Sequence, residues 1–228
     1  MITLAIDSTM NGCSAGLYHD EKGCMAEKIM EMIRGQAEHL MPMIDAVLIE
    51  AGINYSEIDL IAVTKGPGAF TGMRIGLATA KSLALALEIP VVGVCTFRAV
   101  LQTYLNDEPS LGHEFYGVLL ETKRHDYYFQ MFDGKTLQSC SDKLSVSAQG
   151  VMDLVGARIY AVLGDACNRF RSEIDCGENI SFYDIKLPYP SMVADCAMLG
   201  DFETGCEPVY LRAPEIGTPK NPPRKIKS

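Results

Sequence analysis

The stretch "TKGPGAFTGMRIGLATAK", residues 64 to 81, decides how this chain is organised. It starts where an apolar, strand-like run, Leu60 to Val63, ends, and it passes through a glycine-rich turn into a segment rich in alanine and leucine. This pattern is typical of a strand, a tight loop and a helix in direct succession. Such a loop either binds a phosphate or brings another part of the protein close to its backbone.

Neither common phosphate-binding motif fits this loop. A Walker A loop needs a lysine and a hydroxyl directly after its last glycine, and in the nearest frame Thr71 follows Gly66 without the lysine. The dinucleotide fingerprint also fails, because Gly72 comes one position late after Gly66 and Gly68. Binding of an anion by the backbone N–H groups at the helix start stays open as an unspecific alternative.

The segment after the loop has a smooth face. Small residues recur there at four-residue spacing, namely Gly72, Gly76, Ala80 and Ala84. On a helix they share one side, so another element can approach closely. That element is either the chain's own sheet or a helix of a partner, and the spacing leaves both open. Met41, Met43 and Met73 would add adaptable apolar contacts to a partner.

The rest of the chain predicts an α/β protein with two successive parts. The first part has strands at 2–7, 13–20, 23–32, 60–64 and 91–95, with helices at 37–51, 71–88 and 96–105. After a polar linker at 106–114, the second has strands at 115–123, 126–134 and 159–163, with helices at 147–156 and 191–201. Apolar residues ending in Glu121 echo those ending in Asp7, which indicates a duplication. We expect domains at 1–105 and 106–216, and a disordered basic tail at 217–228.

Composition narrows the class of protein. The chain has 228 residues, of which 48% are hydrophobic, and a net charge of −9, which disfavours strong nucleic-acid binding by the chain alone. No apolar run is long enough to span a bilayer and the N-terminus does not resemble a signal peptide, so we expect a cytoplasmic protein. The eight cysteines form no CxxC pair, and buried free thiols are favoured over a metal site.

Few residues suggest catalysis. Asp7, Ser8 and Thr9 follow the first strand, where a carboxylate and hydroxyls either hold a metal and a phosphate or form a simple turn. The histidines are isolated in the sequence, at His19, His39, His113 and His125. They lack the spacing of metal-binding motifs. The sequence therefore predicts neither catalytic residues nor a metal site.

With Asp7-Ser8-Thr9, residues 65–94 and the segment "EPVYLRAPEI" at 207–216, the chain resembles the TsaB family, also called YeaZ. The family signature GPGxFTGxRIG is matched at Gly66, Pro67, Gly68, Phe70, Thr71, Gly72, Arg74, Ile75 and Gly76. The strong match covers roughly residues 1 to 100. The second half matches by the order of its elements and by "PVYLR".

The resemblance implies an actin-like, ribonuclease-H-like fold of two related lobes. It implies the non-catalytic subunit of the machinery that adds threonylcarbamoyl to adenosine in tRNA, with the catalytic paralogue TsaD and the ATPase TsaE as partners. Helices 37–51 and 71–88 would form a bundle with TsaD, or with a second copy in a homodimer. The expected interface residues are Leu40, Met41, Ile44, Gly72, Met73, Gly76, Leu77, Ala80 and Ala84. The resemblance further implies that ATP and metal bind to the partner proteins, and that the chain contacts tRNA only as part of the complex. It also implies that Asp7, Ser8 and Thr9 are the remnant of a phosphate-binding site.

Two positions depart from the family pattern, Gln36 in place of a frequent histidine and Glu121 in place of a frequent aspartate. An alternative function is a free-standing actin-like ATPase or small-molecule kinase that uses Asp7 and Thr9 around magnesium phosphate. A peptidase is the least supported alternative, because zinc ligands and a nucleophile are missing from the pattern.

Overall fold

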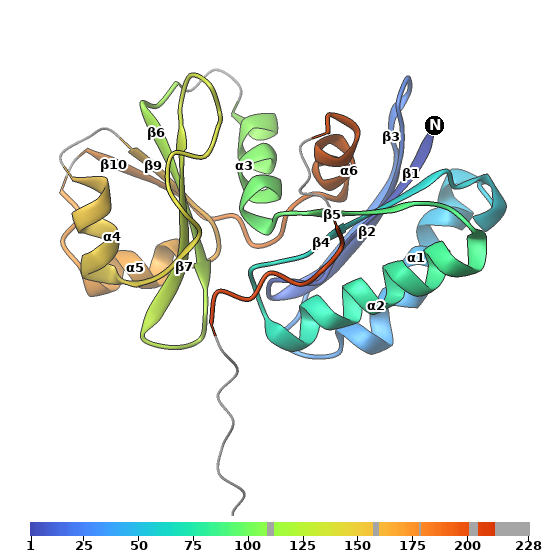
Figure 1. Ribbon diagram of the computed structural model, residues 1–228, viewed down its shortest axis with the longest axis horizontal. Coiled ribbons are helices and arrows are strands. Elements are labelled where there is room, and N and C mark those ends of the chain that lie inside the picture. The colour runs from blue at the N-terminus through green and yellow to red at the C-terminus, as the bar shows by residue number, and fades with distance from the viewer. Residues whose placement is uncertain (109–111, 157–159, 178, 201–204, 213–228) are drawn as a thin grey trace, which may run out of the picture.

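Two five-stranded sheets lie side by side, each carrying its own helices (Figure 1). The computed structural model describes residues 1–108, 112–156, 160–177, 179–200 and 205–212. The expected tail at 217–228 lies outside these residues. The two sheets confirm the prediction of an α/β fold with two related lobes.

The first sheet has the order β3-β2-β1-β4-β5. Its strands are β1 (Ile2–Asp7), β2 (Gly12–His19), β3 (Gly23–Glu31), β4 (Leu60–Thr64) and β5 (Val91–Val94). The first three strands form the predicted antiparallel meander, whereas β4 and β5 add parallel strands on the other side of β1. All five residues of β4 are buried, as expected for an apolar strand inside a covered sheet.

The second sheet has the order β10-β9-β6-β7-β8, which is the same arrangement. Its strands are β6 (Phe115–Glu121), β7 (Asp126–Asp133), β8 (Leu144–Ser147), β9 (Tyr160–Leu163) and β10 (Ile180–Tyr183). The central strand β6 again pairs antiparallel with the next strand and parallel with a later one. This shared topology agrees with the echo between the segments that end at Asp7 and Glu121.

Helices cover both faces of each sheet. They are α1 (Gln36–Ala51), α2 (Phe70–Leu87), α3 (Thr96–Asp107), α4 (Ala148–Val155), α5 (Cys167–Glu173) and α6 (Pro190–Met198), with a short 3₁₀ helix at Tyr55–Glu57. In Figure 1, α1 and α2 lie outside the first sheet, α4 and α5 lie beside the second, and α3 and α6 stand between the two sheets. The strands alternate accordingly: Leu4 and Ile6 face α1 and α2, whereas Ala5 faces α6.

Some elements differ from the sequence predictions. The short elements β8, α5 and β10 were not predicted, because each has at most seven residues and no clear period. Helix α6 comes from the predicted second domain, yet it packs on β1, β2 and β4 of the first sheet. The division after residue 105 therefore separates the strands of the two sheets but not their helices.

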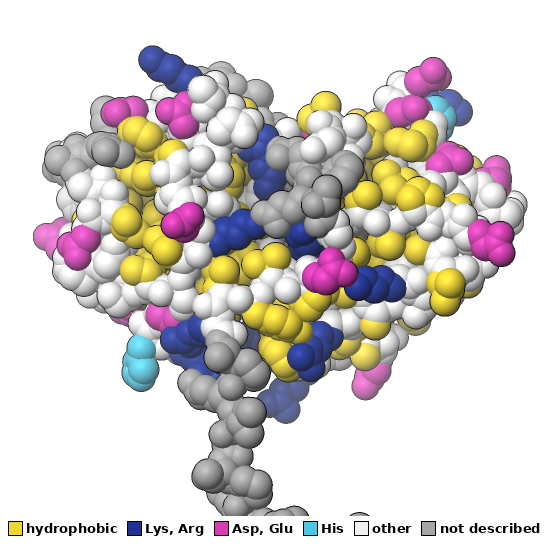
Figure 2. Space-filling view, viewed as in Figure 1, with side chains coloured by type: hydrophobic (Ala, Val, Ile, Leu, Met, Phe, Trp, Pro, Cys, Tyr) yellow, Lys and Arg dark blue, Asp and Glu magenta, His cyan; other side chains and the backbone are white. Residues whose placement is uncertain are grey.

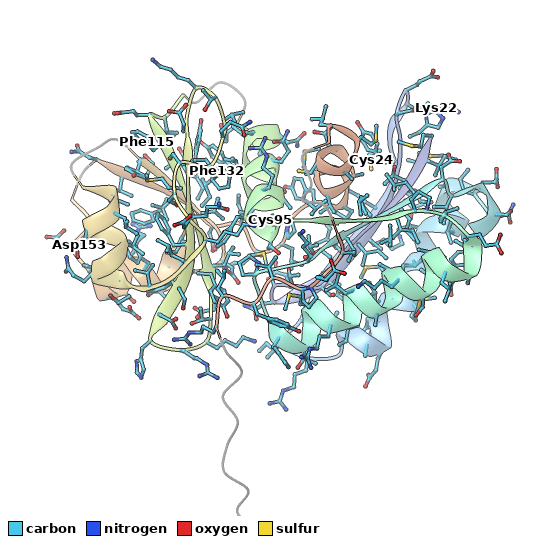
Figure 3. The ribbon with its side chains drawn as sticks, in the orientation of Figure 1. Lys22, Cys24, Cys95, Phe115, Phe132 and Asp153 are labelled. Atoms are coloured by element: carbon cyan, nitrogen blue, oxygen red, sulfur yellow. The ribbon has the colours of Figure 1, made fainter. Side chains whose placement is uncertain are left out.

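The cysteines are free thiols. Five of them are buried, namely Cys13, Cys95, Cys167, Cys196 and Cys206. Cys24 and Cys140 are exposed, which corrects the expectation that the thiols are buried. Figure 3 shows Cys24 on the outer strand β3 and Cys95 near the middle of the molecule. Within the described ranges, no helix has the length and apolar character needed to cross a membrane.

Candidate functional site

The glycine loop holds the end of strand β1 against the start of helix α2. The Ala69 N–H donates to the Thr9 carbonyl oxygen at 2.6 Å. A Cβ atom on Gly68 would lie 2.1 Å from that same oxygen, and one on Gly72 would lie 2.0 Å from the carbonyl oxygen of Ser8. These glycines are therefore required for close contact between two backbone segments of the chain itself.

The same loop also holds the C-terminal segment, which we define as Gly205–Arg212. The Val209 N–H donates to the Lys65 carbonyl oxygen at 2.8 Å. Gly66 has a φ of 100°, and a Cβ atom there would lie 3.0 Å from the Val209 carbonyl oxygen. Pro67, the next residue of the signature, is buried. The loop thus packs against two backbone segments that are far apart in the sequence.

Side chains of the signature extend this attachment. The Arg74 guanidinium lies 3.8 Å from the centre of the Phe70 ring, and its Nε donates to the Tyr210 hydroxyl at 2.8 Å. Further along the C-terminal segment, Arg212 forms an ion pair of 2.6 Å with Asp126 of the second lobe. The segment therefore links the first lobe to the second.

The small-residue stripe of α2 faces the chain's own sheet. A Cβ atom on Gly76 would lie 2.5 Å from the Ser8 hydroxyl oxygen and 3.6 Å from a methyl group of Val63. Ala80 and Ala84 are only 0% and 5% exposed. The expectation that Gly72, Gly76, Ala80 and Ala84 meet a partner helix is therefore corrected, because the first sheet already covers this face.

The larger expected interface residues are mostly core residues as well. Those buried in the core of the first lobe are Leu40, Ile44, Met73 and Leu77. Only Met41 is exposed, at 39%. The outer sides of α1 and α2 instead expose Ile49 and Leu85, at 80% and 81%. In Figure 2, apolar side chains are frequent across the first lobe, on the right of the view.

Asp7 is buried completely and is used for internal hydrogen bonds. Its Oδ1 accepts from the Thr9 hydroxyl at 2.6 Å and from the Thr64 hydroxyl at 2.5 Å. Burial raises the pKa of the Asp7 carboxyl. The Ser8 hydroxyl is also engaged, because it donates to the Gly72 carbonyl oxygen. Of the three residues expected at a phosphate site, only Thr9 lines the neighbouring cleft.

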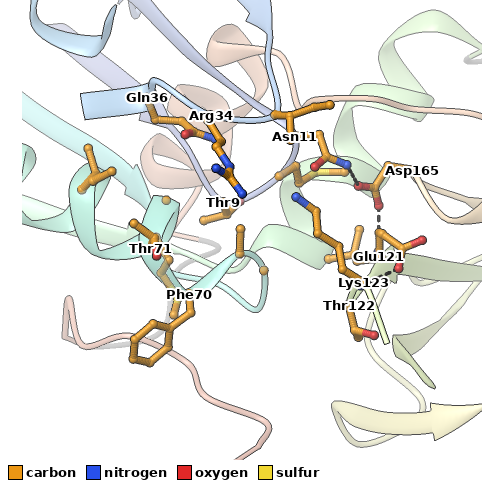
Figure 4. A pocket seen from close by; sticks show the side chains of 18 of the residues that line it. Thr9, Asn11, Arg34, Gln36, Phe70, Thr71, Glu121, Thr122, Lys123 and Asp165 are labelled. Carbon is orange, nitrogen blue, oxygen red and sulfur yellow. Dashed lines mark hydrogen bonds between the residues drawn. The ribbon is translucent and has the colours of Figure 1, made fainter. Parts of the chain in front are cut away.

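A cleft of about 760 Å³ lies between the two lobes. The first lobe contributes the turn after β1, the segment that precedes α1 and the start of α2, including Phe70 and Thr71. The second lobe contributes the turn after β6, and the C-terminal segment forms a further wall. Figure 4 shows Arg34 of the first lobe and Lys123 of the second with their charged ends directed into the cleft.

Two carboxylates of the second lobe lie at the same cleft. Asp165 Oδ1 accepts from the Glu121 N–H at 2.9 Å, and Asn11 of the first lobe donates to Asp165 Oδ2 at 3.4 Å. Burial raises the pKa of Asp165 to about 7, with a smaller contribution from the Glu121 charge. The Glu121 carboxylate is paired with Arg169 at 2.9 Å. Asp165 is thus a half-buried acid that joins the two lobes through Asn11.

The histidines do not assemble a site. Among the residues with described positions, no three histidine, cysteine, aspartate or glutamate side chains form a group that could hold a metal ion. His113 is packed among Tyr104, Tyr116 and Tyr183, and burial lowers its pKa. The geometry therefore directs attention to the glycine loop, the exposed side of α1 and α2, and the cleft.

Comparison with known families identifies the chain. Residues 30–201 match the model of the family TsaD, tRNA N6-adenosine threonylcarbamoyltransferase. The chain belongs to this family. Within it, relatives named TsaB at 34–35% identity and the structural match to YeaZ place the chain in the TsaB (YeaZ) group.

The relatives of this TsaB-group chain differ in the share of the chain that aligns with them. TsaB of Escherichia coli is 35% identical over 102 residues, which is 45% of this chain and 43% of that protein. The alignment thus spans less than half of the named relative. An uncharacterised protein of Mycobacterium tuberculosis is 27% identical and covers 93% of the chain. YeaZ from Pseudomonas aeruginosa has a TM-score of 0.77 at 23% identity, covering 92% of this chain and 99% of that chain, which supports the actin-like two-lobed fold.

The two departures from the TsaB pattern, Gln36 and Glu121, both line the cleft. The sequence distinguishes Gln36 and Glu121 but does not connect them, and it gives no motif around Arg34, Lys123 or Asp165. The duplication held a usable signal for Lys123, because the turn after β6 corresponds to the turn after β1 that contains Thr9.

Proposed function

We propose that this chain acts in the biosynthesis of threonylcarbamoyladenosine in tRNA, as a scaffolding subunit that binds and activates the catalytic paralogue TsaD. The family match over residues 30–201 and the names of the TsaB relatives support this role. The TsaE ATPase is the further partner of this assembly. Because the chain carries a net charge of −9, tRNA is bound mainly by the other subunits.

The observation that carries the proposal is the exposure of several large apolar side chains on two adjacent helices. Helices α1 and α2 are in contact with each other on the outside of the first sheet. Met41, Ile49 and Leu85 are large apolar side chains that remain exposed on them. Exposed apolar groups on neighbouring helices are typical of protein–protein contact sites. We place the TsaD contact here and not on the buried small-residue stripe.

The proposed role is non-catalytic. Asp7, the carboxylate that the sequence singles out for chemistry, is buried and accepts hydrogen bonds from Thr9 and Thr64. This engagement supports the scaffold over the alternative of a magnesium-dependent kinase, which needs an accessible carboxylate. ATP and metal are then supplied by TsaD and TsaE, and the chain contributes a rigid surface.

The test is co-purification with TsaD after a charge is placed on the helix surface. Leu85→Glu and Ile49→Glu should each weaken the complex at least about tenfold, because a carboxylate would be desolvated in an apolar contact. Both side chains are exposed, so the isolated variants should keep their unfolding temperature. Leu154→Glu is the matched control, since Leu154 is 38% exposed on α4 of the other lobe.

The readouts are the fraction of TsaD retained, size-exclusion chromatography of the chain alone, and threonylcarbamoyladenosine formed in tRNA by the complete set of proteins. Complexes that form equally well with Leu85→Glu, Ile49→Glu and Leu154→Glu would refute this contact site. Modification at full rate without the chain would refute the activating role. A homodimer lost in the same two variants would show that a second copy uses the same surface.

A further inference from the structure

The turn between β6 and β7 presents three consecutive basic side chains. Lys123, Arg124 and His125 follow one another in this turn, and all three are exposed. In Figure 2, basic side chains gather along the middle and the lower middle of the molecule, whereas acidic ones lie mainly toward its periphery. A chain with a net charge of −9 therefore carries a local positive charge at this turn, which attracts polyanions.

The backbone of this turn is fixed by hydrogen bonds. Arg169 of α5 donates to the carbonyl oxygens of Arg124 and Asp126. The Arg124 N–H donates to the Thr122 hydroxyl at 3.2 Å, and that hydroxyl donates to the Asp126 carbonyl oxygen at 2.6 Å. A side chain that projects from a fixed backbone loses less conformational freedom when it binds. Because these bonds use backbone atoms of the turn, the Arg124 side chain can be exchanged without removing them.

The C-terminal segment brings exposed aromatic rings to the same surface. Its Arg212 is paired at 2.6 Å with Asp126, which directly follows the turn. Two residues earlier in the segment, the Tyr210 ring lies 5.4 Å from the Phe70 ring, and the two residues are 42% and 44% exposed. The Arg74 guanidinium lies against the Phe70 ring and donates to the Tyr210 hydroxyl. Unpaired bases of RNA stack on exposed aromatic rings and arginines of this kind.

The sequence that follows Arg212 adds further positive charge. Residues 213–228 contain a single acid, Glu215, and four cations, namely Lys220, Arg224, Lys225 and Lys227. Because Arg212 is bonded to Asp126, this basic stretch starts beside the β6–β7 turn. Cations supplied from two separate parts of the sequence thus meet on one side of the molecule, where they can contact successive phosphates of one strand.

The acidic groups of this region are mostly neutralised or distant from the turn. Asp126 is paired with Arg212, and Glu121 is paired with Arg169. Glu207 of the C-terminal segment is 79% exposed and lies 3.9 Å from the Lys81 ammonium group, so it is the carboxylate that would oppose a polyanion.

The surroundings of the cations favour RNA over other polyanions. Residues 122–125 are all polar, whereas a turn that binds an anionic membrane would also insert apolar side chains. The exposed rings of Phe70 and Tyr210 offer stacking to a base, which an acidic polypeptide does not have.

We propose that the β6–β7 turn, the C-terminal segment and residues 213–228 form a contact surface for the tRNA that the assembled complex modifies. Phosphates lie at Arg124 and at the cations of residues 213–228, and an unpaired base lies on the rings of Phe70 and Tyr210. The identity of the RNA rests on the proposed function. The net charge of −9 keeps this contact weak in the isolated chain, so TsaD supplies most of the affinity and this surface orients the tRNA. The turn belongs to the second lobe, whereas we place the TsaD contact on the outer sides of α1 and α2 of the first.

The test is the fluorescence anisotropy of a labelled, unmodified tRNA transcript, titrated with the complex of chain and TsaD, and with the full chain alone at low ionic strength. Arg124→Gln should weaken binding about threefold and lower the slope of log affinity against log salt concentration by about 1, because one phosphate contact is lost. A variant with glutamine at all four cationic positions of residues 213–228 should weaken binding at least about tenfold and lower the slope by about 3.

Two further variants separate stacking from charge. Phe70→Leu should weaken tRNA binding about fivefold and leave the salt slope unchanged, because stacking on a ring releases no counterions. Glu207→Gln should tighten binding about twofold, because a repulsive charge is removed.

Lys22→Gln is the matched control. Lys22 is exposed in the turn between β2 and β3, and Figure 3 shows it at the far end of the first lobe. Its substitution removes one exposed cation, as Arg124→Gln does, but should leave the tRNA affinity and the salt slope unchanged. Thermal unfolding and co-purification with TsaD verify that each variant is folded and still assembles.

Several results would overturn the proposal. One is a tRNA affinity and salt slope that Arg124→Gln and the variant of residues 213–228 share with Lys22→Gln. Another is an absence of tRNA binding by the chain both alone and with TsaD. Vesicles containing phosphatidylserine, or a polyglutamate peptide, that lose affinity in the same variants while tRNA does not would assign the surface to a membrane or to an acidic protein instead.

The outcomes also separate this surface from the proposed function. Weaker tRNA binding with full TsaD binding in Arg124→Gln would support the surface and leave the scaffold role intact. A parent chain that does not bind TsaD would refute the scaffold role, and the titration of the chain alone would still decide whether the surface binds RNA.

Discussion

The turns after β1 and β6 occupy corresponding places in two sheets of identical order, yet they have different surroundings. Asp7 ends β1 and Ser8 follows it, and both are buried and hydrogen-bonded within the chain. After β6, Lys123 is exposed and directed into the cleft. The glycine loop packs directly on the first turn, whereas Asp165 and Arg169 contact the second turn at Glu121 and leave Lys123 exposed. A shared topology therefore fixes where a turn lies but not whether its side chains can meet a ligand.

The helices that pack on the outer faces of the two sheets also differ, because those of the first lobe are much longer. Helices α1 and α2 have 16 and 18 residues, whereas α4 and α5 have 8 and 7. The long pair buries one side on the sheet and leaves Ile49 and Leu85 exposed on the other. The first lobe thus exposes large apolar side chains on its long helices, and both lobes supply polar residues to the cleft.

The largest effect is expected from a substitution in the glycine loop, which covers the turn after β1 but not the turn after β6. Gly72→Val should lower the free energy of unfolding by more than about 4 kcal/mol, because its side chain would overlap the Ser8 carbonyl oxygen. Urea denaturation measures the change. Gly112→Ala is the control, since nothing lies within 4 Å of an added Cβ there, and it should change stability by less than about 0.5 kcal/mol. Equal effects of the two substitutions would contradict the close backbone contact.

Asp165, which contacts the turn after β6, should make the stability of the chain depend on pH. Its pKa is raised from 3.8 to about 7, so the folded chain binds a proton that the unfolded chain releases between these values. The stabilisation is complete below pH 4 and is lost as the pH rises through 7, by on the order of 4 kcal/mol. Asp165→Asn should flatten this part of the profile, measured by urea unfolding at several pH values. Asp7 changes in the same direction, so some slope should remain.

The matched control for Asp165 is Asp153→Asn, because Asp153 is exposed on α4 of the same lobe (Figure 3). It should leave the pH profile unchanged. A profile of Asp165→Asn identical to that of the parent chain would show that Asp165 is ionised in the folded state.

The smallest expected effect concerns the attachment of the C-terminal segment. Arg74→Lys keeps the charge but loses the planar contact with Phe70 and the hydrogen bond to Tyr210, so it should cost about 1 kcal/mol of stability. Arg171→Lys in the second lobe should cost less, because its guanidinium lies 5.3 Å from the Phe182 ring. Thermal unfolding compares the two. A larger loss for Arg171→Lys would argue against the C-terminal segment as a stabilising link.

The sequence was sufficient for the sheets and their central strands, because buried parallel strands form continuous apolar runs such as Leu60 to Val63. It was not sufficient for the direction of the small-residue stripe. Spacing by four residues places Gly76 and Ala80 on one side of a helix, but it does not say whether a sheet or a partner covers that side. The exposure of Leu85 on the opposite side was visible only in the structure.

The sequence also did not predict the cleft, because its residues are brought together only by tertiary packing. Arg34, Lys123 and Asp165 come from three distant segments, and no local motif connects them. Only the packing of the two lobes brings them together. The signature glycines are evident in the sequence, but their contacts with Thr9 and Val209 depend on segments about 60 and 140 residues away.

The packing of α6 and the C-terminal segment on the first lobe has a consequence for synthesis on the ribosome. Strands β1, β4 and β5 emerge early, but the face that includes Ala5, Ala62 and Val94 packs against α6 as well as against Ala99 of α3. Part of this face stays exposed to water until residue 198 has left the exit tunnel. The first lobe therefore cannot complete its folding until the C-terminal part of the chain has been synthesised. A nascent chain stalled before α6 would present this apolar face to chaperones.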